Sequence, residues 1–327
     1  IFDFLWRFFI IRVFVARYAR TRLLLIGDTP IMHDIASYLR MHPQFGYDVL
    51  LWVKETPPPQ QSQELSQLIT ANNIDLIVIP PHYQNSDTLL VKLVYRLLPL
   101  HTDIINSSDF YELLFRKVPL DDLREHWFIE KITTRRFLYD VIKRTLDVLL
   151  ATFLFVILLP LLALIAFFIA LTSRGSILYA QARVGKNEQL FTLYKFRTMR
   201  EHADHEGPLW ATAGDPRVTF FGNILRYGHF DELPQLINIL KGDISFVGPR
   251  PERVELAHEY RQLPYYEVRH IIKPGLTGWA QINYRPSASL EEAYEKLKYD
   301  IYYIKNRSLV FDILITIKTI RLFFVRA

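Results

Sequence analysis

Two adjacent carboxylates, Asp231 and Glu232, stand in a short segment that also carries the cations Arg226, Lys241 and Arg250. Neighbouring carboxylates repel each other, so keeping both ionised requires nearby cations or a metal ion. The structural alternative is that the acids favour the start of a helix and that the prolines flanking Arg250 end one. The pair by itself favours the structural alternative, which the remaining motifs overturn.

A basic strand upstream of the acidic pair supplies two more cations. Strand alternation in Tyr194-Lys195-Phe196-Arg197 would send Lys195 and Arg197 to the same face. Such a face suits a phosphate clamp, and the alternative is a solvated strand face. The segment 273–282 is similarly open: its lysine, two glycines and Trp279 could hold a base or a sugar, or form a structural corner.

Composition limits the classes to which the chain can belong. Its 327 residues, half of them hydrophobic, are enough for two domains that each bury a core. A net charge of +5 favours an anionic partner such as a phosphate, a nucleotide or a lipid headgroup. No zinc-finger, RNP or basic-zipper pattern occurs, so we expect no nucleic-acid partner. The absence of cysteine excludes disulfides, thiolate catalysis and cysteine-ligated metals.

The first 22 residues are apolar and aromatic but contain five arginines against one acid, Asp3. These arginines interrupt the run before it reaches the about 20 apolar residues that a membrane span requires. We interpret 1–20 as the end of a transmembrane helix with a basic cytoplasmic flank, with an interfacial helix as the alternative. Because the chain opens with Ile1 inside hydrophobic sequence, we expect a fragment or a processed form.

Short apolar runs alternate with helical patterns from 21 to 130. Strands are predicted at 22–27, 47–53, 74–80 and 103–105, and helices at 31–41, 64–71 and 88–98. This alternation is typical of a parallel, doubly wound sheet, so we predict a Rossmann-like α/β domain. Its first turn, Gly27-Asp28-Thr29-Pro30, lacks the later glycines that let backbone approach a pyrophosphate. We therefore predict that this domain does not bind NAD in the usual way.

Residues 148–172 carry no charge, and their length predicts a membrane helix. Two features argue against a simple span. Pro160 divides the segment into halves of about a dozen residues, the length of re-entrant segments. Both flanks are also basic, which conflicts with the positive-inside tendency of a span. We predict a helix that enters from the cytoplasm, breaks at Pro160 and returns, with a kinked span as the alternative.

The segments after the acidic pair are largely helical in pattern. Residues 291–306 predict a charged, Tyr-rich helix that contains Asp300. Residues 309–325 predict an amphipathic helix at the membrane interface, with a core helix as the alternative. Residues 139–327 would then form a small mixed α/β domain around the membrane segment, joined to the first domain through 106–140.

The order of motifs from Tyr139 to the C-terminus resembles the bacterial sugar transferases. These are monotopic polyprenyl-phosphate hexose-1-phosphate transferases that begin exopolysaccharide, capsule or O-antigen synthesis. The resemblance rests on KRTLD, the proline-containing apolar segment, QARVG, YKFRTM, DPRVT, DELPQLINILKGDISFVGPRPE, KPGLTGWAQIN and YDIYYIKN. Residues 1–130 resemble, by layout more than by motif, the end of the transmembrane bundle and the Rossmann-like regulatory domain of larger, WbaP-like members.

The resemblance implies transfer of hexose-1-phosphate from a UDP-sugar, with glucose or galactose expected, to polyprenyl (undecaprenyl) phosphate, releasing UMP. It implies that Asp231 is the nucleophile, forming an aspartyl-phosphosugar, and that Glu232 binds Mg²⁺ or tunes Asp231. The remaining candidates are Lys195, Arg197, Arg226 and Arg250 for phosphate binding, and Asp300 for the metal or phosphate network. The site would lie among membrane lipids at the cytoplasmic face of a bacterial inner membrane, and a homodimer is compatible with it.

Two functions of other classes compete with this one. A nucleotide-sugar oxidoreductase or epimerase is suggested by the first domain, but the missing glycines count against it. A non-catalytic membrane scaffold for polysaccharide export would not need the acidic and basic motifs, which argue against it.

Overall fold

The computed structural model describes residues 20–55, 62–80, 95, 102–132, 136–200, 215–284 and 289–326. The chain forms two compact units, 1–127 and 128–327, and helix α6 (Glu125–Ile132) crosses their boundary. The membrane or interfacial helix predicted at 1–20 and most of the helix predicted at 88–98 lie outside the described residues.

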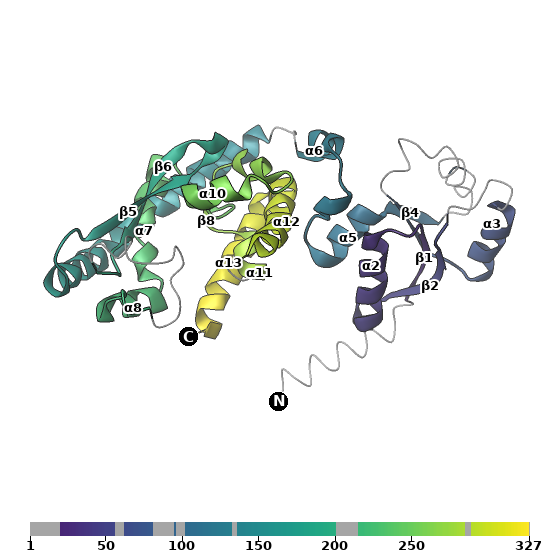
Figure 1. Ribbon diagram of the computed structural model, residues 1–327, viewed down its shortest axis with the longest axis horizontal. Coiled ribbons are helices and arrows are strands. Elements are labelled where there is room, and N and C mark those ends of the chain that lie inside the picture. Colours follow the sequence, from purple (N-terminus) through teal and green to yellow (C-terminus); the bar gives the residue numbers. More distant parts are fainter. Residues whose placement is uncertain are drawn as a thin grey trace, which may run out of the picture. The chain divides into compact units, whose positions relative to one another are not determined.

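The first unit is built on a parallel sheet of four described strands in the order β2-β1-β3-β4. Side chains of β1 point alternately to its two faces. Leu23 and Leu25 pack with α2 and α5, and Leu24 and Ile26 pack with α3, so α2 and α3 flank the sheet from opposite sides (Figure 1). The elements are β1 (Thr21–Ile26), α2 (Pro30–Met41), η1 (Pro43–Phe45), β2 (Tyr47–Val53), α3 (Ser62–Ala71), β3 (Leu76–Ile79), β4 (Asp103–Asn106), α5 (Ser107–Phe115) and η5 (Leu120–Asp122).

The turn after β1 requires a glycine at position 27. Gly27 has a φ of 106°, a conformation that other residues rarely adopt. A Cβ at this position would lie 2.7 Å from Cγ of Pro80, which follows β3. Gly27 therefore lets two strand ends approach each other. The parallel sheet with helices on both faces agrees with the sequence pattern, while the assignment to the Rossmann class stays a prediction.

The second unit begins with α7 (Phe137–Thr172), a helix of 36 residues that is long and apolar enough to cross a membrane. Only 11% of its most apolar 18-residue window is buried. The predicted break at Pro160 is wrong, because helical structure continues through this residue. Proline removes one backbone hydrogen bond, and an apolar helix tolerates that loss where its other backbone groups stay paired. The re-entrant topology stays a prediction.

The rest of the second unit packs short strands and helices against α7. They are β5 (Leu178–Val184), η6 (Lys186–Glu188), β6 (Leu190–Phe196), α8 (Phe220–Tyr227), η8 (Phe230–Glu232), α9 (Gln235–Lys241), β7 (Ser245–Val247), α10 (Val254–Tyr260), η9 (Tyr266–His270), β8 (Gly275–Thr277), α11 (Trp279–Asn283), α12 (Leu290–Asn306) and α13 (Leu309–Arg326). Strands β5 and β6 pair antiparallel, and β7 and β8 pair parallel. Apolar clusters join α7 to α9 and β6, and, further along, to α8.

Helix α13 is fixed to α7 and α12 by one carboxylate. Asp312 accepts hydrogen bonds from Tyr139 (2.9 Å), Lys143 (2.7 Å) and Tyr303 (2.7 Å). Ile315 is fully buried, whereas Val310 is 76% exposed. One side of α13 thus packs on the unit and another is open, as the sequence predicted for an amphipathic helix, and its place at a membrane interface stays a prediction.

Candidate active site

The acidic pair lies in a one-turn helix, η8, between α8 and α9. His229 adopts left-handed backbone (φ 53°), which turns the chain sharply after α8. Helix α9 is then fixed to β6 through Asn238, which accepts from the backbone N–H of Tyr194 (3.0 Å) and donates to the carbonyl of Thr192 (2.7 Å). Lys195 follows Tyr194 in β6, so these hydrogen bonds of Asn238 also bring the Lys195 side chain to the acidic pair.

Glu232 is held by two cations. Its Oε1 lies 2.6 Å from Nζ of Lys195 and 2.9 Å from Nη2 of Arg250. Burial alone would raise the pKa of Glu232, but the charges of Arg250 and Lys195 outweigh it and hold the pKa well below its usual range. Burial also lowers the pKa of Lys195. Glu232 is therefore a fixed negative charge whose field the cations largely offset.

Asp231 differs from its neighbour. The residue is 9% exposed, and its carboxylate accepts no hydrogen bond in the described part of the chain. Burial raises its pKa above the usual value, and the adjacent Glu232 raises it further, against the opposing charges of Lys195 and Arg226. A desolvated carboxylate without partners is more nucleophilic than one bound by donors.

Arg226 and Arg197 have different surroundings. Nε of Arg226 donates to Oγ1 of Thr198 (2.8 Å). The positive charge of Arg226 is close enough to lower the pKa of Asp231. Strand β6 ends at Phe196, so the predicted alternation does not extend to Arg197, whose guanidinium donates to the carbonyl of Ser173 at the end of α7 (2.8 Å). The structure therefore brings Lys195, Arg226 and Arg250 to the acidic pair but not Arg197.

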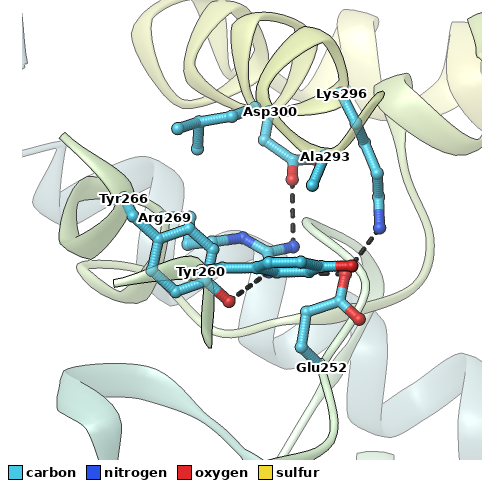
Figure 2. Close-up of a pocket in the computed structure, with 8 residues that line it drawn as sticks. Glu252, Tyr260, Tyr266, Arg269, Ala293, Lys296 and Asp300 are labelled. Atoms are coloured by element: carbon cyan, nitrogen blue, oxygen red, sulfur yellow. Dashed lines mark hydrogen bonds and ion pairs between the residues drawn. The ribbon is translucent and has the colours of Figure 1, made fainter. Parts of the chain in front are cut away.

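Asp300 belongs to a second, buried cluster of charged side chains around Arg269 (Figure 2). Arg269 stands at its centre and donates to Oδ2 of Asp300 (3.0 Å) and to the backbone carbonyl of Arg250 (2.9 Å). Oε1 of Glu252 lies 3.5 Å from Nη1 of Arg269 and 2.5 Å from Nζ of Lys296. Burial opposes ionisation of Glu252, yet Lys296 and Arg269 lower its pKa to about 2. Asp300 is thus linked through Arg269 to the backbone of Arg250, and its role in a metal or phosphate network stays a prediction.

A cavity of about 1110 Å³ opens beside the acidic pair. Glu232 and Phe230 line it, together with apolar side chains of α7 and α13, among them Leu154, Leu158 and Ile320. The cavity therefore offers charged walls and an apolar wall to one ligand or to two.

Sequence reasoning missed part of the basic wall, namely Arg183, Arg253 and Lys296. A signal was present for two of them, because Arg183 lies within QARVG and Arg253 closely follows Arg250. For the segment 273–282, the sequence allowed either a base- or sugar-binding loop or a structural corner. Trp279 is 5% exposed and packs on Tyr302 and Phe311, so its ring is part of a structural corner.

The donors fit a magnesium ion only with help from a substrate. No group of three His, Cys, Asp or Glu side chains that could hold a metal occurs among the described residues. Mg²⁺ often uses one or two carboxylates and completes its shell with water and substrate phosphates. The unpartnered oxygens of Asp231 and Oε2 of Glu232, which no described cation contacts, match that requirement.

Comparison with known proteins gives a family and several relatives. A sequence model of the bacterial sugar transferase family matches residues 138–326. The chain is 39% identical over 222 residues to the UDP-N-acetylgalactosamine-undecaprenyl-phosphate N-acetylgalactosaminephosphotransferase of Aeromonas hydrophila, a match of 68% of this chain and 52% of the relative. It is 40% identical over 322 residues to the UDP-glucose:undecaprenyl-phosphate glucose-1-phosphate transferase of Xanthomonas campestris pv. campestris, a match of 91% and 65%.

A protein of Klebsiella pneumoniae with the same name as the Xanthomonas relative is 37% identical over 315 residues, covering 93% of this chain and 68% of its own length. The chain thus spans roughly half to two thirds of the length of these relatives. The family match covers more than half of the chain and includes every residue of the acidic and basic groups described above. The chain therefore belongs to the bacterial sugar transferase family.

Proposed function

We propose that this protein transfers hexose-1-phosphate from a UDP-sugar to polyprenyl phosphate, the first step of a bacterial surface polysaccharide. One observation carries the proposal: a desolvated Asp231, to which no described residue donates a hydrogen bond, lies beside a Glu232 that two cations hold ionised. The names of the three relatives, each a sugar-phosphate transferase acting on undecaprenyl phosphate, support it.

In the first step an oxygen of Asp231 attacks the phosphorus that carries the sugar. The bond from that phosphorus to the bridging oxygen breaks, and UMP leaves with the bonding electron pair. The product is an aspartyl-phosphosugar. Lys195, Arg226 and Arg250 are close enough to the acidic pair to offset charge on the phosphoryl oxygens.

In the second step a phosphate oxygen of the polyprenyl acceptor attacks the same phosphorus. The bond to Asp231 breaks, the carboxylate is restored, and a polyprenyl diphosphosugar is released. A covalent intermediate allows a water-soluble donor and a lipid acceptor to use one site in turn. The mixed polar and apolar lining of the cavity suits both ligands.

Mg²⁺, held by Asp231 and Glu232 together with the diphosphate, would supply further charge neutralisation. Glu232 would also orient Lys195 and Arg250, which both donate to its Oε1. This role does not depend on the metal.

The proposed location is the cytoplasmic face of a bacterial inner membrane. Leu154 and Leu158 of the apolar helix α7 line the cavity, so a lipid acceptor could reach the site from the bilayer. In a re-entrant arrangement, reporters fused before Lys143 and after Arg174 would lie on the same side. Reporters on opposite sides would contradict it.

A UMP-release assay tests the proposal. Purified protein would be offered a panel of UDP-sugars with undecaprenyl phosphate, and we expect release with UDP-glucose or UDP-galactose. Asp231→Asn should abolish release. Asp140→Asn is a matched control, because this carboxylate is 57% exposed and lies 3.9 Å from its cation. Release by Asp231→Asn at the rate of the control would reject the assignment.

A further inference from the structure

The cavity carries more positive charge than the acidic pair can balance. Among the described residues that line it, six side chains are cationic (Arg183, Lys195, Arg226, Arg250, Arg253 and Lys296) and two are carboxylates (Glu232 and Glu252), a net of +4. Glu232 accounts for Lys195 and Arg250, and Glu252 for Lys296. Arg183, Arg226 and Arg253 are the lining cations that form no ion pair with either carboxylate in the described part of the chain.

Two of these cations are placed together by the backbone. Arg183, near the end of β5, pairs antiparallel with Arg253 in an isolated β-bridge. The pairing is reinforced because Nη1 of Arg183 donates to the carbonyl of Pro251 (3.0 Å) and the N–H of Val184 donates to the carbonyl of Glu252 (3.1 Å). Like charges are thus held close by contacts that do not involve an anion.

The surroundings do not neutralise these two guanidinium groups. The side-chain bonds of Arg183 go to Pro251 and to Oε1 of Gln181, which are neutral, and neither Arg183 nor Arg253 forms an ion pair within the described ranges. Burial and, to a smaller extent, the charges of Arg250 and Arg253 together lower the pKa of Arg183 to about 10. An arrangement of this kind is stabilised by binding an anion, and paired guanidinium groups favour phosphate.

Arg250 connects this group to the acidic pair, because it contacts Glu232 on one side and its charge is felt by Arg183 on the other. We propose that Arg183 and Arg253 form a second anion subsite, which binds the nucleotide-side phosphate of a nucleoside diphosphate sugar and then the nucleoside monophosphate that leaves. This inference rests on the proposed function and adds the orientation of the bound UDP-sugar. The sugar-bearing phosphate lies at Asp231, and the nucleotide lies beyond Arg250.

The test is nucleotide binding by the full chain in detergent, with UMP as the probe and calorimetry as the readout. Arg253→Gln and Arg183→Gln should each weaken UMP binding by about tenfold or more, the loss expected for one charged hydrogen bond. Arg261→Gln is the matched control, because Arg261 is 58% exposed and pairs with Glu188 outside the cavity. It should bind UMP as the unmodified protein does.

Steady-state kinetics give a second readout that a purely structural role would not reproduce. In Arg253→Gln the KM for the UDP-sugar should rise and inhibition by UMP should weaken, while the KM for polyprenyl phosphate stays unchanged. Unchanged UMP affinity in both variants would overturn the subsite, as would a rise in the acceptor KM instead of the donor KM.

The outcomes separate this inference from the function on which it rests. If the unmodified protein transfers the sugar phosphate and both variants bind UMP with unchanged affinity, the subsite is rejected and the proposed function stands. Failure of the unmodified protein both to bind UMP and to release it from any UDP-sugar would reject the subsite and the proposed function together. Because Arg183 also supports the backbone of Pro251, Arg183→Lys, which keeps one charge, would be expected to restore part of the affinity if folding is intact.

Discussion

Two groups of charged side chains both contact Arg250, and they differ in how their carboxylates are paired with cations. The cavity cluster is Asp231, Glu232 and Lys195, of which Glu232 and Lys195 line the cavity. It pairs Glu232 with two cations, and no residue that the structure describes donates a hydrogen bond to Asp231. The buried cluster, Glu252, Arg269, Lys296 and Asp300, gives every carboxylate a cation within 3.5 Å. A fully paired group builds structure, whereas a carboxylate left unpaired at the cost of desolvation is available for chemistry.

The largest expected effect separates activity from stability. Asp231→Asn should lower kcat by about a thousandfold or more, since it removes the proposed nucleophile. Its melting temperature should stay equal or rise, because the substitution removes a desolvated charge that has no hydrogen-bond donor in the described structure. Kinetics and thermal unfolding in the same detergent measure both. A large loss of stability would mean that Asp231 is structural.

In the buried cluster, the corresponding substitution, Glu252→Gln, should lower stability. Glu252→Gln removes the charge that holds Lys296 and Arg269, and should cost about 3 kcal/mol at neutral pH, as a shift of the pKa from 4.5 to about 2 implies. A folded-state pKa below the unfolded value contributes stability that is present above about pH 4.5 and lost as the pH falls through 2. The gap in melting temperature between the two proteins should therefore narrow on acidification. A constant gap would contradict the pairing.

Glu232→Gln should change the pH dependence of transfer. The ionised form of Asp231 is the nucleophile, so activity should fall as the pH drops through its raised pKa. Glu232 contributes to that rise, and removing its charge should shift the acid limb to lower pH. The maximal rate should also fall by about ten- to a hundredfold, because Lys195 and Arg250 lose their common acceptor. An unshifted acid limb would show that another group titrates.

The smallest effect is expected at Arg197. Its guanidinium caps the end of α7 through Ser173 and does not reach the acidic pair. Arg197→Gln should change the KM for the UDP-sugar less than about twofold, because the hydrogen bond that it loses lies at the end of α7 and not at the acidic pair. Lys195→Gln is the contrasting variant, and its KM or kcat should change strongly. Equal effects of the two substitutions would restore the predicted clamp on one strand face.

Local patterns predicted most of the fold. Strand β2 was placed at its observed residues, and β1, β3 and β4 to within about two residues, because apolar runs between turns have few alternative structures. Pro160 was misjudged because the rule for proline takes no account of an apolar helix that keeps its other hydrogen bonds. The end of β6 at Phe196 was missed for a related reason: periodicity does not reveal where a strand stops.

The candidate site was predicted in part. Motif order pointed to Asp231, Glu232, Lys195 and Arg250, which the structure brings together. It did not give the pairing of Arg183 with Arg253, because this bridge joins segments 70 residues apart and depends on tertiary structure. Likewise, Arg269 was overlooked, since a buried arginine that supports a backbone carbonyl carries no local signature.

The central claim is that Asp231, which receives no hydrogen bond from the described residues, carries the sugar phosphate during transfer. Protein incubated with UDP-sugar in the absence of acceptor, quenched, digested and analysed by mass spectrometry tests this directly. We predict one added hexose phosphate on the peptide containing Asp231, discharged by polyprenyl phosphate and absent from Asp231→Asn. UMP formation and transfer without any such adduct, or an adduct that persists in Asp231→Asn, would contradict the account.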